Sequence, residues 1–510
     1  MSNSADHRAS SHSTLHQRRA GVLLHPTSLP GQYEQGDLGP EAYHFVDFLN
    51  ACGLTVWQML PVTPTHEDGS PYMGLSVDAG NPDLISLELL NQWGWLTDDE
   101  LKEAMNVSSF APNKSICLNR AYQGFLKRAD KLQKQELQKF KDENGAWLED
   151  YALFVVLREH YQHKGWQQWP KPYRQREAEA LATAKEHNSD NIDKICFEQF
   201  VFYRQWALLK QYANERQVQM VGDMPIFVAH DSAEVWQHQE YFDLDADGSP
   251  NKVAGVPPDY FSETGQRWGN PLYLWDRIAE DHYEWWIERF HVALTLYDAV
   301  RVDHFRGFEA YWEIDAQEET AINGHWVKAP GEALFNALQE SIGELPIIVE
   351  DLGTITPEVN ALREKFGWPG MKILQFAFDG DDANPYLPHN HIENCVVYTG
   401  THDNDTTLSW FEELPAQVKE NVNQYMGNTG EPMPWALVEC AFRSVANWAI
   451  VPMQDLLSLG KGHRMNTPGT SEGNWCWRFQ WEQVDEHVAE KVKAMVTQFE
   501  RCLLYTSDAA

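Results

Sequence analysis

The sequence lacks any arrangement of cysteines that indicates a disulfide framework or a zinc site. Its 510 residues include 7 cysteines, an odd number, and none of them forms a CxxC pair. Reduced thiols in a cytoplasmic protein are the simplest interpretation. No apolar run approaches the length needed to cross a membrane, so we expect a soluble protein with no membrane partner.

Basic residues are scarce relative to acidic ones. Lys and Arg number 40 against 75 Asp and Glu, which gives a formal net charge of −35. So acidic a surface argues against nucleic acids and other polyanions as partners, and it favours neutral or cationic ligands. Tryptophan, by contrast, is abundant, with 21 residues. Most of them should lie in the core, but sugar-binding clefts also place flat aromatic faces against pyranose rings.

Eight short apolar segments alternate with helical patterns along the chain. They lie near residues 22, 57, 221, 300, 348, 374, 397 and 450, and polar or charged clusters follow all but the sixth. Repeated β-then-α units of this number predict an α/β protein with a (β/α)8 TIM barrel. We expect the barrel to span 20–500, with no separate C-terminal β domain.

The remaining segments are assigned by composition. A mainly helical insertion is expected at about 84–195, and a lid and substrate loop region at about 229–275. Residues 1–19 are polar, rich in Ser, His and Arg, and lack the apolar segment of a signal peptide. We expect a disordered tail there and a second tail at 503–510.

The most informative stretch is Tyr297–Gly307, an apolar strand with a densely charged C-terminal tip. Arg301 and Asp303 are two residues apart, so on a strand their side chains point to the same face. A guanidinium beside a carboxylate keeps it ionised, as a carboxylate nucleophile requires. From this stretch alone, a nucleophile and a structural ion pair are equally good interpretations.

Other predicted strands also end in acids, namely Asp223, Glu350 and Asp403. Parallel strands of a barrel bring their C-terminal ends to one rim, so these carboxylates should converge with Asp303. Converging carboxylates repel one another, which favours a functional site. Three chemistries fit: a metal site, proton abstraction to an enolate, and glycosidic bond cleavage.

The three chemistries differ in what else they need. A metal site could use His25, His304 and His402, but no HxH or HExxH spacing occurs and arginines flank the key acid. The segment Asp243–Gly248 resembles the start of a calcium loop but has Ala254 at the twelfth position, so a plain turn is expected. Enolate chemistry calls for a lysine base or magnesium, and no strand ends in lysine. Glycoside chemistry, with aromatic platforms and two carboxyl groups, fits best.

Several motifs, in order, resemble those of the 4-α-glucanotransferases, the amylomaltases or disproportionating enzymes of glycoside hydrolase family 77 in the α-amylase clan. The resemblance covers nearly everything from Gly21 to Phe479. It rests on the three acidic motifs Arg301–Gly307, Glu350–Gly353 and Thr401–Asp405, and on Leu24–Pro30, Ser70–Tyr72, Gly222–Val228, Gly265–Pro271, Asn466–Thr470 and Gly473–Trp475.

The resemblance implies roles for individual residues. Asp303 would be the nucleophile, Glu350 the acid and base, and Asp403 the residue that stabilises the transition state. A retaining mechanism would place the carboxyl groups of Asp303 and Glu350 about 5–5.5 Å apart. No metal and no cofactor is implied. The implied substrate-binding residues are Tyr72, Asp223, Tyr260, Phe261, Trp268, Arg301, His304 and His402.

The implied reaction transfers a segment of an α-1,4-glucan to the 4-OH of glucose or a maltooligosaccharide. Donors would be maltooligosaccharides and glucans derived from starch or glycogen. The alternative is an α-glucan hydrolase using the same three acids, and a lid formed by Pro257–Phe261 favours transfer because it would exclude water. The loop Met73–Ala79 and Cys476 depart from the family pattern, and neither touches the acids.

Overall fold

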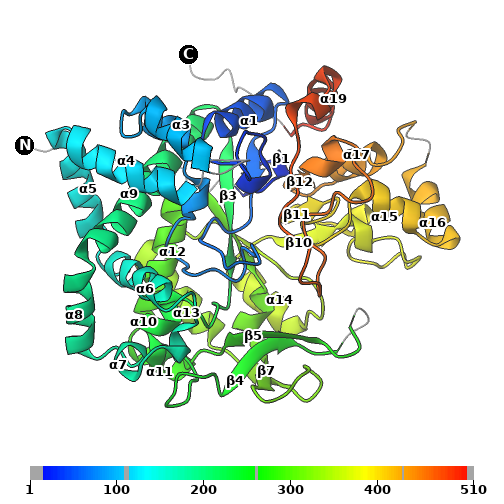
Figure 1. The fold of residues 1–510 in the computed structure, drawn as a ribbon. Helices are drawn as coiled ribbons and strands as arrows, with labels where there is room; N and C mark the ends of the chain where they lie inside the picture. The colour runs from blue at the N-terminus through cyan, green and yellow to red at the C-terminus, as the bar shows by residue number, and fades with distance from the viewer. Residues whose placement is uncertain (1–14, 108–113, 259–261, 428–429, 502–510) are drawn as a thin grey trace, which may run out of the picture.

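The computed structural model describes residues 15–107, 114–258, 262–427 and 430–501. Within these residues, eight parallel strands close into a barrel, which confirms the predicted (β/α)8 fold (Figure 1). Around the barrel the order is β1-β12-β11-β10-β9-β6-β3-β2. The strands are β1 Arg19–Leu23, β2 Val56–Gln58, β3 Gln219–Pro225, β6 Ala299–Asp303, β9 Ile347–Val349, β10 Gly370–Ile373, β11 Cys395–Tyr398 and β12 Trp448–Pro452.

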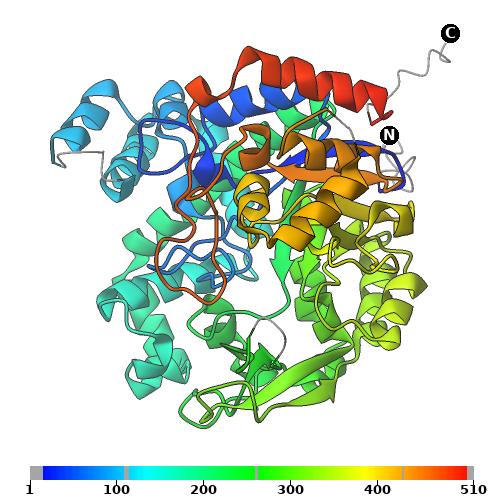
Figure 2. The same cartoon turned by 90° about the vertical axis from the view of Figure 1, so that its right-hand side faces the viewer.

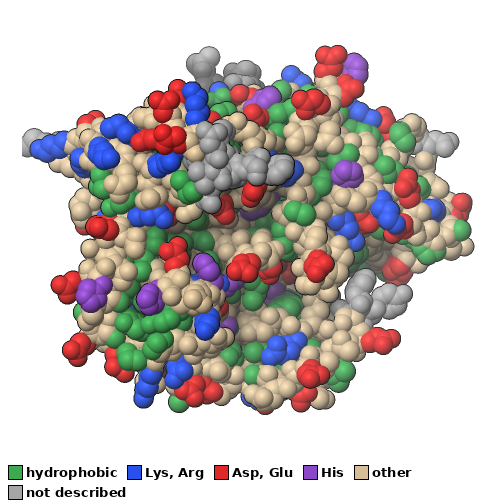
Figure 3. All heavy atoms as spheres, viewed as in Figure 1, with side chains coloured by type: hydrophobic (Ala, Val, Ile, Leu, Met, Phe, Trp, Pro, Cys, Tyr) green, Lys and Arg blue, Asp and Glu red, His purple; other side chains and the backbone are tan. Residues whose placement is uncertain are grey.

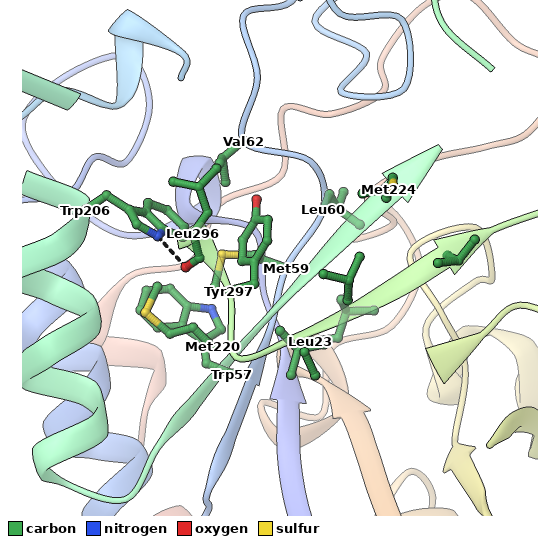
Figure 4. Packing of buried hydrophobic residues seen from close by; sticks show 14 of the residues in the cluster. Leu23, Trp57, Met59, Leu60, Val62, Trp206, Met220, Met224, Leu296 and Tyr297 are labelled. Atoms are coloured by element: carbon green, nitrogen blue, oxygen red, sulfur yellow. Dashed lines mark hydrogen bonds between the residues drawn. The ribbon is translucent and has the colours of Figure 1, made fainter. Parts of the chain in front are cut away.

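The barrel strands are apolar and rich in β-branched residues because both of their faces are covered. Every residue of β11 and β12 is buried. Figure 4 shows the packing beside β3, where Trp57, Met220 and Tyr297 lie together and Trp206 donates a hydrogen bond to the carbonyl oxygen of Leu296. This dense packing holds the strand ends, and therefore the side chains at the rim, in fixed positions.

Helices surround the barrel (Figures 1 and 2). Many of them bury apolar residues on one side, as amphipathic helices do. The long helix α9 leads into β3 and buries residues along most of its length. The helices outside the region between β2 and β9 are α1 Pro40–Ala51, α14 Pro357–Lys365, α15 Thr407–Glu413, α16 Ala416–Met426, α17 Trp435–Arg443, α18 Met453–Leu456 and α19 Glu486–Gln498.

A helical region lies between β2 and β3, at the left of Figure 1. Its α5 begins with a capping box, in which Asp130 and Gln133 satisfy each other's backbone amides. The region comprises α2 Leu87–Gln92, α3 Asp98–Val107, α4 Lys114–Arg128, α5 Lys131–Glu143, α6 Leu148–His160, α7 Lys171–Arg174, α8 Ala178–His187 and α9 Ser189–Glu215.

A second sheet was not anticipated from the sequence. In the described part of the chain it has the order β5-β4-β7-β8, and it lies at the lower edge of Figure 1. The expectation that 229–275 is mainly loop is therefore wrong for β4 and β5. The elements of this part are α10 Ala233–Gln237, β4 Lys252–Val256, β5 Gln266–Pro271, α11 Trp275–Glu280, α12 Glu284–Leu296, β7 Ala310–Asp315, β8 His325–Lys328 and α13 Gly331–Ile342.

The predicted N-terminal tail, 1–19, overlaps the first strand of the barrel. Strand β1 begins at Arg19, and Arg18 donates hydrogen bonds to the carbonyl oxygens of Ser444 and Phe499. Residues 1–14 of that predicted tail, and the predicted tail at 503–510, lie outside the described residues. In the described ranges, no helix is both long and apolar enough to cross a membrane.

Candidate active site

The predicted acids lie at the C-terminal ends of four barrel strands. Asp223 is in β3, Asp303 is the last residue of β6, Glu350 directly follows β9, and Asp403 lies in the loop after β11. This is the end of the barrel where catalytic groups gather in this fold. In the view of Figure 1, the surface is hollowed above the second sheet, with acidic and histidine side chains at its edges (Figure 3).

Arg301 forms ion pairs with two of these acids. Its guanidinium lies 2.9 Å from Asp303 Oδ1 and 2.6 Å from Asp223 Oδ2. The second pair follows from strand register, because Asp223 in β3 stands opposite Arg301 in β6. Tyr72 also donates a 2.7 Å hydrogen bond to Asp223 Oδ2. Burial raises the pKa of Asp223, and the charge of Arg301 opposes that rise.

Glu350 has a different environment. Its carboxyl oxygens accept hydrogen bonds from the backbone amides of His304, at 2.8 Å, and Leu352, at 2.9 Å. Burial, and then the charge of Asp303, raise the pKa of Glu350 to about 7, although Arg301 and the two amides oppose the change. The carboxyl group of Glu350 can therefore hold a proton near neutral pH.

His304 connects the acids to the second sheet. Its backbone is left-handed, with φ of 47°, a strained conformation for a residue other than glycine. Its ring meets the ring of Trp268 in β5 edge-to-face, at a centroid distance of 4.8 Å. Burial lowers the pKa of His304 to about 4, so the imidazole is neutral at pH 7. The left-handed turn thus aims an amide at Glu350 and a neutral ring at Trp268.

Asp403 is the most exposed acid of the set, with 47 % of its side chain accessible. Its Oδ1 lies 3.4 Å from His402 Nε2 and accepts a 2.6 Å hydrogen bond from Asn466 Nδ2. Arg464 donates to the backbone carbonyl of Asp403. The ring of Tyr72 stacks on the ring of His402, with 5.2 Å between the ring centroids. Tyr72 therefore contacts both the Asp223 side and the Asp403 side of the site.

The structure thus brings most of the predicted residues into one network of contacts. Tyr260 and Phe261 lie outside the described residues. Arg464, Asn466 and Trp475 were not predicted as site residues, although the ring centroid of Trp475 lies 5.9 Å from that of Tyr72. Asn466 and Trp475 stand in motifs noted for the resemblance, and their polar and aromatic character on a loop was the available signal.

The arrangement pairs a carboxylate held by an arginine with a carboxyl group that carries a proton near pH 7. Such a pair can supply a nucleophile and a general acid to one bond.

The segment Asp243–Gly248, which resembles the start of a calcium loop, forms a turn in which Asp245 accepts hydrogen bonds from the amides of Asp247 and Ser249. The described ranges contain no group of three or more His, Cys, Asp or Glu that could hold a metal ion.

Comparison with known proteins shows which family this chain resembles in sequence and in fold. The 4-alpha-glucanotransferase of Thermus thermophilus is 48 % identical, covering 95 % of this chain and 99 % of that protein. The chloroplastic/amyloplastic 4-alpha-glucanotransferase of Solanum tuberosum is 45 % identical, over 91 % of this chain and 82 % of its own length. The amylomaltase of Streptococcus agalactiae, solved with acarbose, superposes with a TM-score of 0.91 at 40 % identity, covering 96 % and 100 % of the two chains. A family model described as 4-alpha-glucanotransferase matches residues 24–484, and the chain therefore belongs to the 4-alpha-glucanotransferase family.

Proposed function

We propose that this enzyme transfers a segment of an α-1,4-glucan to the 4-OH of glucose or a maltooligosaccharide by a retaining double displacement. The observation that carries the mechanism is the pairing of Asp303 with Arg301 beside Glu350, whose pKa is raised to about 7. Arg301 forms an ion pair with one acid, and the neighbouring acid can keep a proton near neutral pH. These are the two states that the first half of the reaction needs.

In the first step, Glu350 donates its proton to the glycosidic oxygen while Asp303 attacks the anomeric carbon. The bond to the leaving sugar breaks, and a covalent glucosyl ester forms on Asp303. In the second step, the ionised Glu350 removes the proton from the acceptor 4-OH, whose oxygen displaces Asp303. The predicted separation of the two carboxyl groups for this mechanism is about 5–5.5 Å.

The remaining residues bind the sugar and stabilise the charge that develops. Asp403 is proposed to stabilise the oxocarbenium-like transition state, and Asn466 and His402 support its carboxylate. Tyr260 and Phe261 are proposed as lid residues over the acceptor side. The proposed contacts to substrate hydroxyls and ring faces are Tyr72, Asp223, Trp268, Arg301, His304 and His402.

The proposed substrates are maltooligosaccharides and glucans derived from starch or glycogen, with glucose as an acceptor. Two relatives support this class: the Streptococcus agalactiae amylomaltase was solved with acarbose, and the Solanum tuberosum relative is named amyloplastic. For this chain we propose a cytoplasmic location, since its cysteines form no disulfide framework.

Pure maltotriose separates transfer from hydrolysis. A transferase produces glucose and a ladder of longer chains with no net gain of reducing ends, because each bond broken is replaced by another. Reducing ends that rise as fast as maltotriose disappears would establish the hydrolase instead. Asp303→Asn should remove nearly all activity in the same assay, and more than about a per cent of the wild-type rate would exclude Asp303 as the nucleophile.

A further inference from the structure

The C-terminal end of β12 carries a buried acid that the proposed chemistry does not use. Asp455 lies in α18, directly after the strand, and is 1 % exposed. Burial raises the pKa of Asp455, and the hydrogen bonds that its carboxyl group accepts oppose that rise. A buried carboxyl group is costly unless it is well bonded, so its contacts deserve an explanation.

Those contacts close the base of the loop that carries Asp403. Oδ2 of Asp455 accepts 2.6 Å hydrogen bonds from the hydroxyl groups of Thr399 and Thr407, and Oδ1 accepts a 2.9 Å bond from the amide of Thr407. Thr399 directly follows β11, and Thr407 is the first residue of α15. Asp455 therefore holds both ends of the segment 400–406 together.

The neighbouring residue holds the other segment that contacts Asp403. Gln454 donates from Nε2 to the carbonyl oxygen of His463, at 3.2 Å. The next residues of that segment are Arg464, which donates to the backbone carbonyl of Asp403, and Asn466, which donates to its carboxylate. Two consecutive side chains at one strand end thus hold the two segments that meet at Asp403.

Polar contacts hold the loop that carries Asp403. A cavity lies against it, and the cavity lining includes His402, Asn404, Gln454 and Arg464. Several hydrogen bonds of the loop are local, such as those from Thr401 to the side chain of Asn404. A further bond joins Gln375 Nε2 to the carbonyl oxygen of Asp405, at 2.9 Å, from the β10 side. The position of Asp403 therefore depends on polar contacts at the loop base.

We propose that Gln454 and Asp455 form a clamp that positions Asp403 for the transition state, an inference that rests on the role proposed for Asp403. Asp455 does not touch the substrate and is a positioning residue. Because Asp403 is needed chiefly as charge develops, a displaced loop should lower kcat more than it changes KM.

Conservative and disruptive variants separate position from charge. In Asp455→Asn, the amide oxygen can accept from the amide of Thr407, and the NH2 group can donate to both threonine hydroxyls, which can turn to accept. The loop base stays closed without the charge. Asp455→Ala opens it, and a displacement of about 1 Å in a catalytic group can cost roughly 100-fold in rate.

The matched control is a half-buried acid at the other end of the barrel. Asp298 immediately precedes β6 and accepts hydrogen bonds from the amide of Met220, at 2.8 Å, and from Asn214 Nδ2, at 2.9 Å. Asp298→Ala removes a comparable set of hydrogen bonds far from the rim. It should lower the melting temperature and leave kcat for maltotriose disproportionation unchanged.

The experiment measures kcat, KM and melting temperature for each full-length variant with maltotriose. We expect Asp455→Ala to lower kcat about 10- to 100-fold, with KM within about threefold of the wild-type value. Asp455→Asn should have a kcat within about threefold of the wild-type value. A kcat for Asp455→Ala within threefold of wild type overturns the clamp, as does an equal kcat loss in Asp298→Ala.

Two further variants keep the outcome decisive. If Asp455→Ala does not fold, Thr399→Val removes one hydroxyl from the clamp at constant shape, and an unchanged kcat in that variant overturns the proposal. Asp403→Asn tests the role of Asp403 itself. An active Asp403→Asn enzyme refutes that role, whereas an inactive one together with a fully active Asp455→Ala enzyme refutes the clamp alone.

Discussion

Replacing Glu350 by glutamine should make the stability of the enzyme less sensitive to pH. In the folded protein the pKa of Glu350 is raised from 4.5 to about 7, chiefly by burial. Below pH 4.5 the carboxyl group is protonated in both the folded and the unfolded chain, and its contribution to stability is fully present. As the pH rises towards 7, the unfolded chain releases the proton and the folded chain does not, so stability is lost.

The size of the effect follows from the two pKa values. Each pH unit between them costs about 1.4 kcal/mol, which gives about 3 kcal/mol in total. Unfolding entropy of about 2 cal/mol/K per residue amounts to roughly 1 kcal/mol per kelvin for 510 residues. The melting temperature of Glu350→Gln relative to wild type should therefore rise by about 3 °C between pH 4.5 and pH 7.

Calorimetric scans at one scan rate, from pH 4.5 to pH 8, measure this difference. The glutamine places an NH2 group against a backbone amide, either that of His304 or that of Leu352, and this costs about 1–3 kcal/mol at every pH. The constant cost cancels when the pH values are compared. Glu490→Gln is the control, because its side chain is 84 % exposed. A Tm difference that does not change with pH would refute the reasoning.

Three other outcomes are expected. The rate of donor cleavage should be full well below pH 7 and fall about tenfold per pH unit above it, because Glu350 must carry a proton; a flat pH–rate profile would contradict this. Arg501→Met should lower the melting temperature by about 3–5 °C, since its buried guanidinium donates to the carbonyl oxygens of Phe442, Ser444 and Ala446; an unchanged Tm would show that these bonds add nothing. Dialysis against EDTA should leave the transfer rate unchanged, and strong inhibition would restore the metal interpretation.

The barrel could be predicted because its strands are apolar on both faces. The segment predicted near residue 397 is the strand β11, Cys395–Tyr398. The segment predicted near residue 374 is displaced, since β10 ends at Ile373 and a 3-10 turn covers Leu374–Phe376. A short buried apolar run has no periodicity that distinguishes a strand from a turn.

The second sheet could not be predicted in the same way. Its strand β7 mixes buried and polar residues without a strict alternation, and β8 carries His325 and Lys328 at its ends. Val253 and Ile314 of this sheet form a small separate cluster with Ala321, whereas Ala254 and Tyr311 join the main core. Pairing between β4 and β7 joins parts of the chain that are far apart in sequence, and local pattern does not encode such pairing.

In the candidate active site, too, local sequence pattern predicted some residues, and tertiary contacts position the others. Strand periodicity alone placed Arg301 beside Asp303. The positions of Arg464 and Asn466 depend on a loop with neither helical nor strand pattern, whose location is set by contacts such as that of Gln454 with His463. Residues positioned by tertiary contacts in a loop leave no local signal beyond their polarity.

The acids at this rim differ in whether they form an ion pair with Arg301. Arg301 is bound to Asp223 and Asp303, whereas in the described part of the chain no ion pair joins Glu350 to a cation. The charge of Arg301, and after it the two backbone amides that Glu350 receives, lower the pKa of Glu350, but burial and the charge of Asp303 outweigh them. The β3–β6 register that places Asp223 opposite Arg301 therefore sets which acids form an ion pair with it, and Glu350 is left with backbone amides as its hydrogen-bond donors.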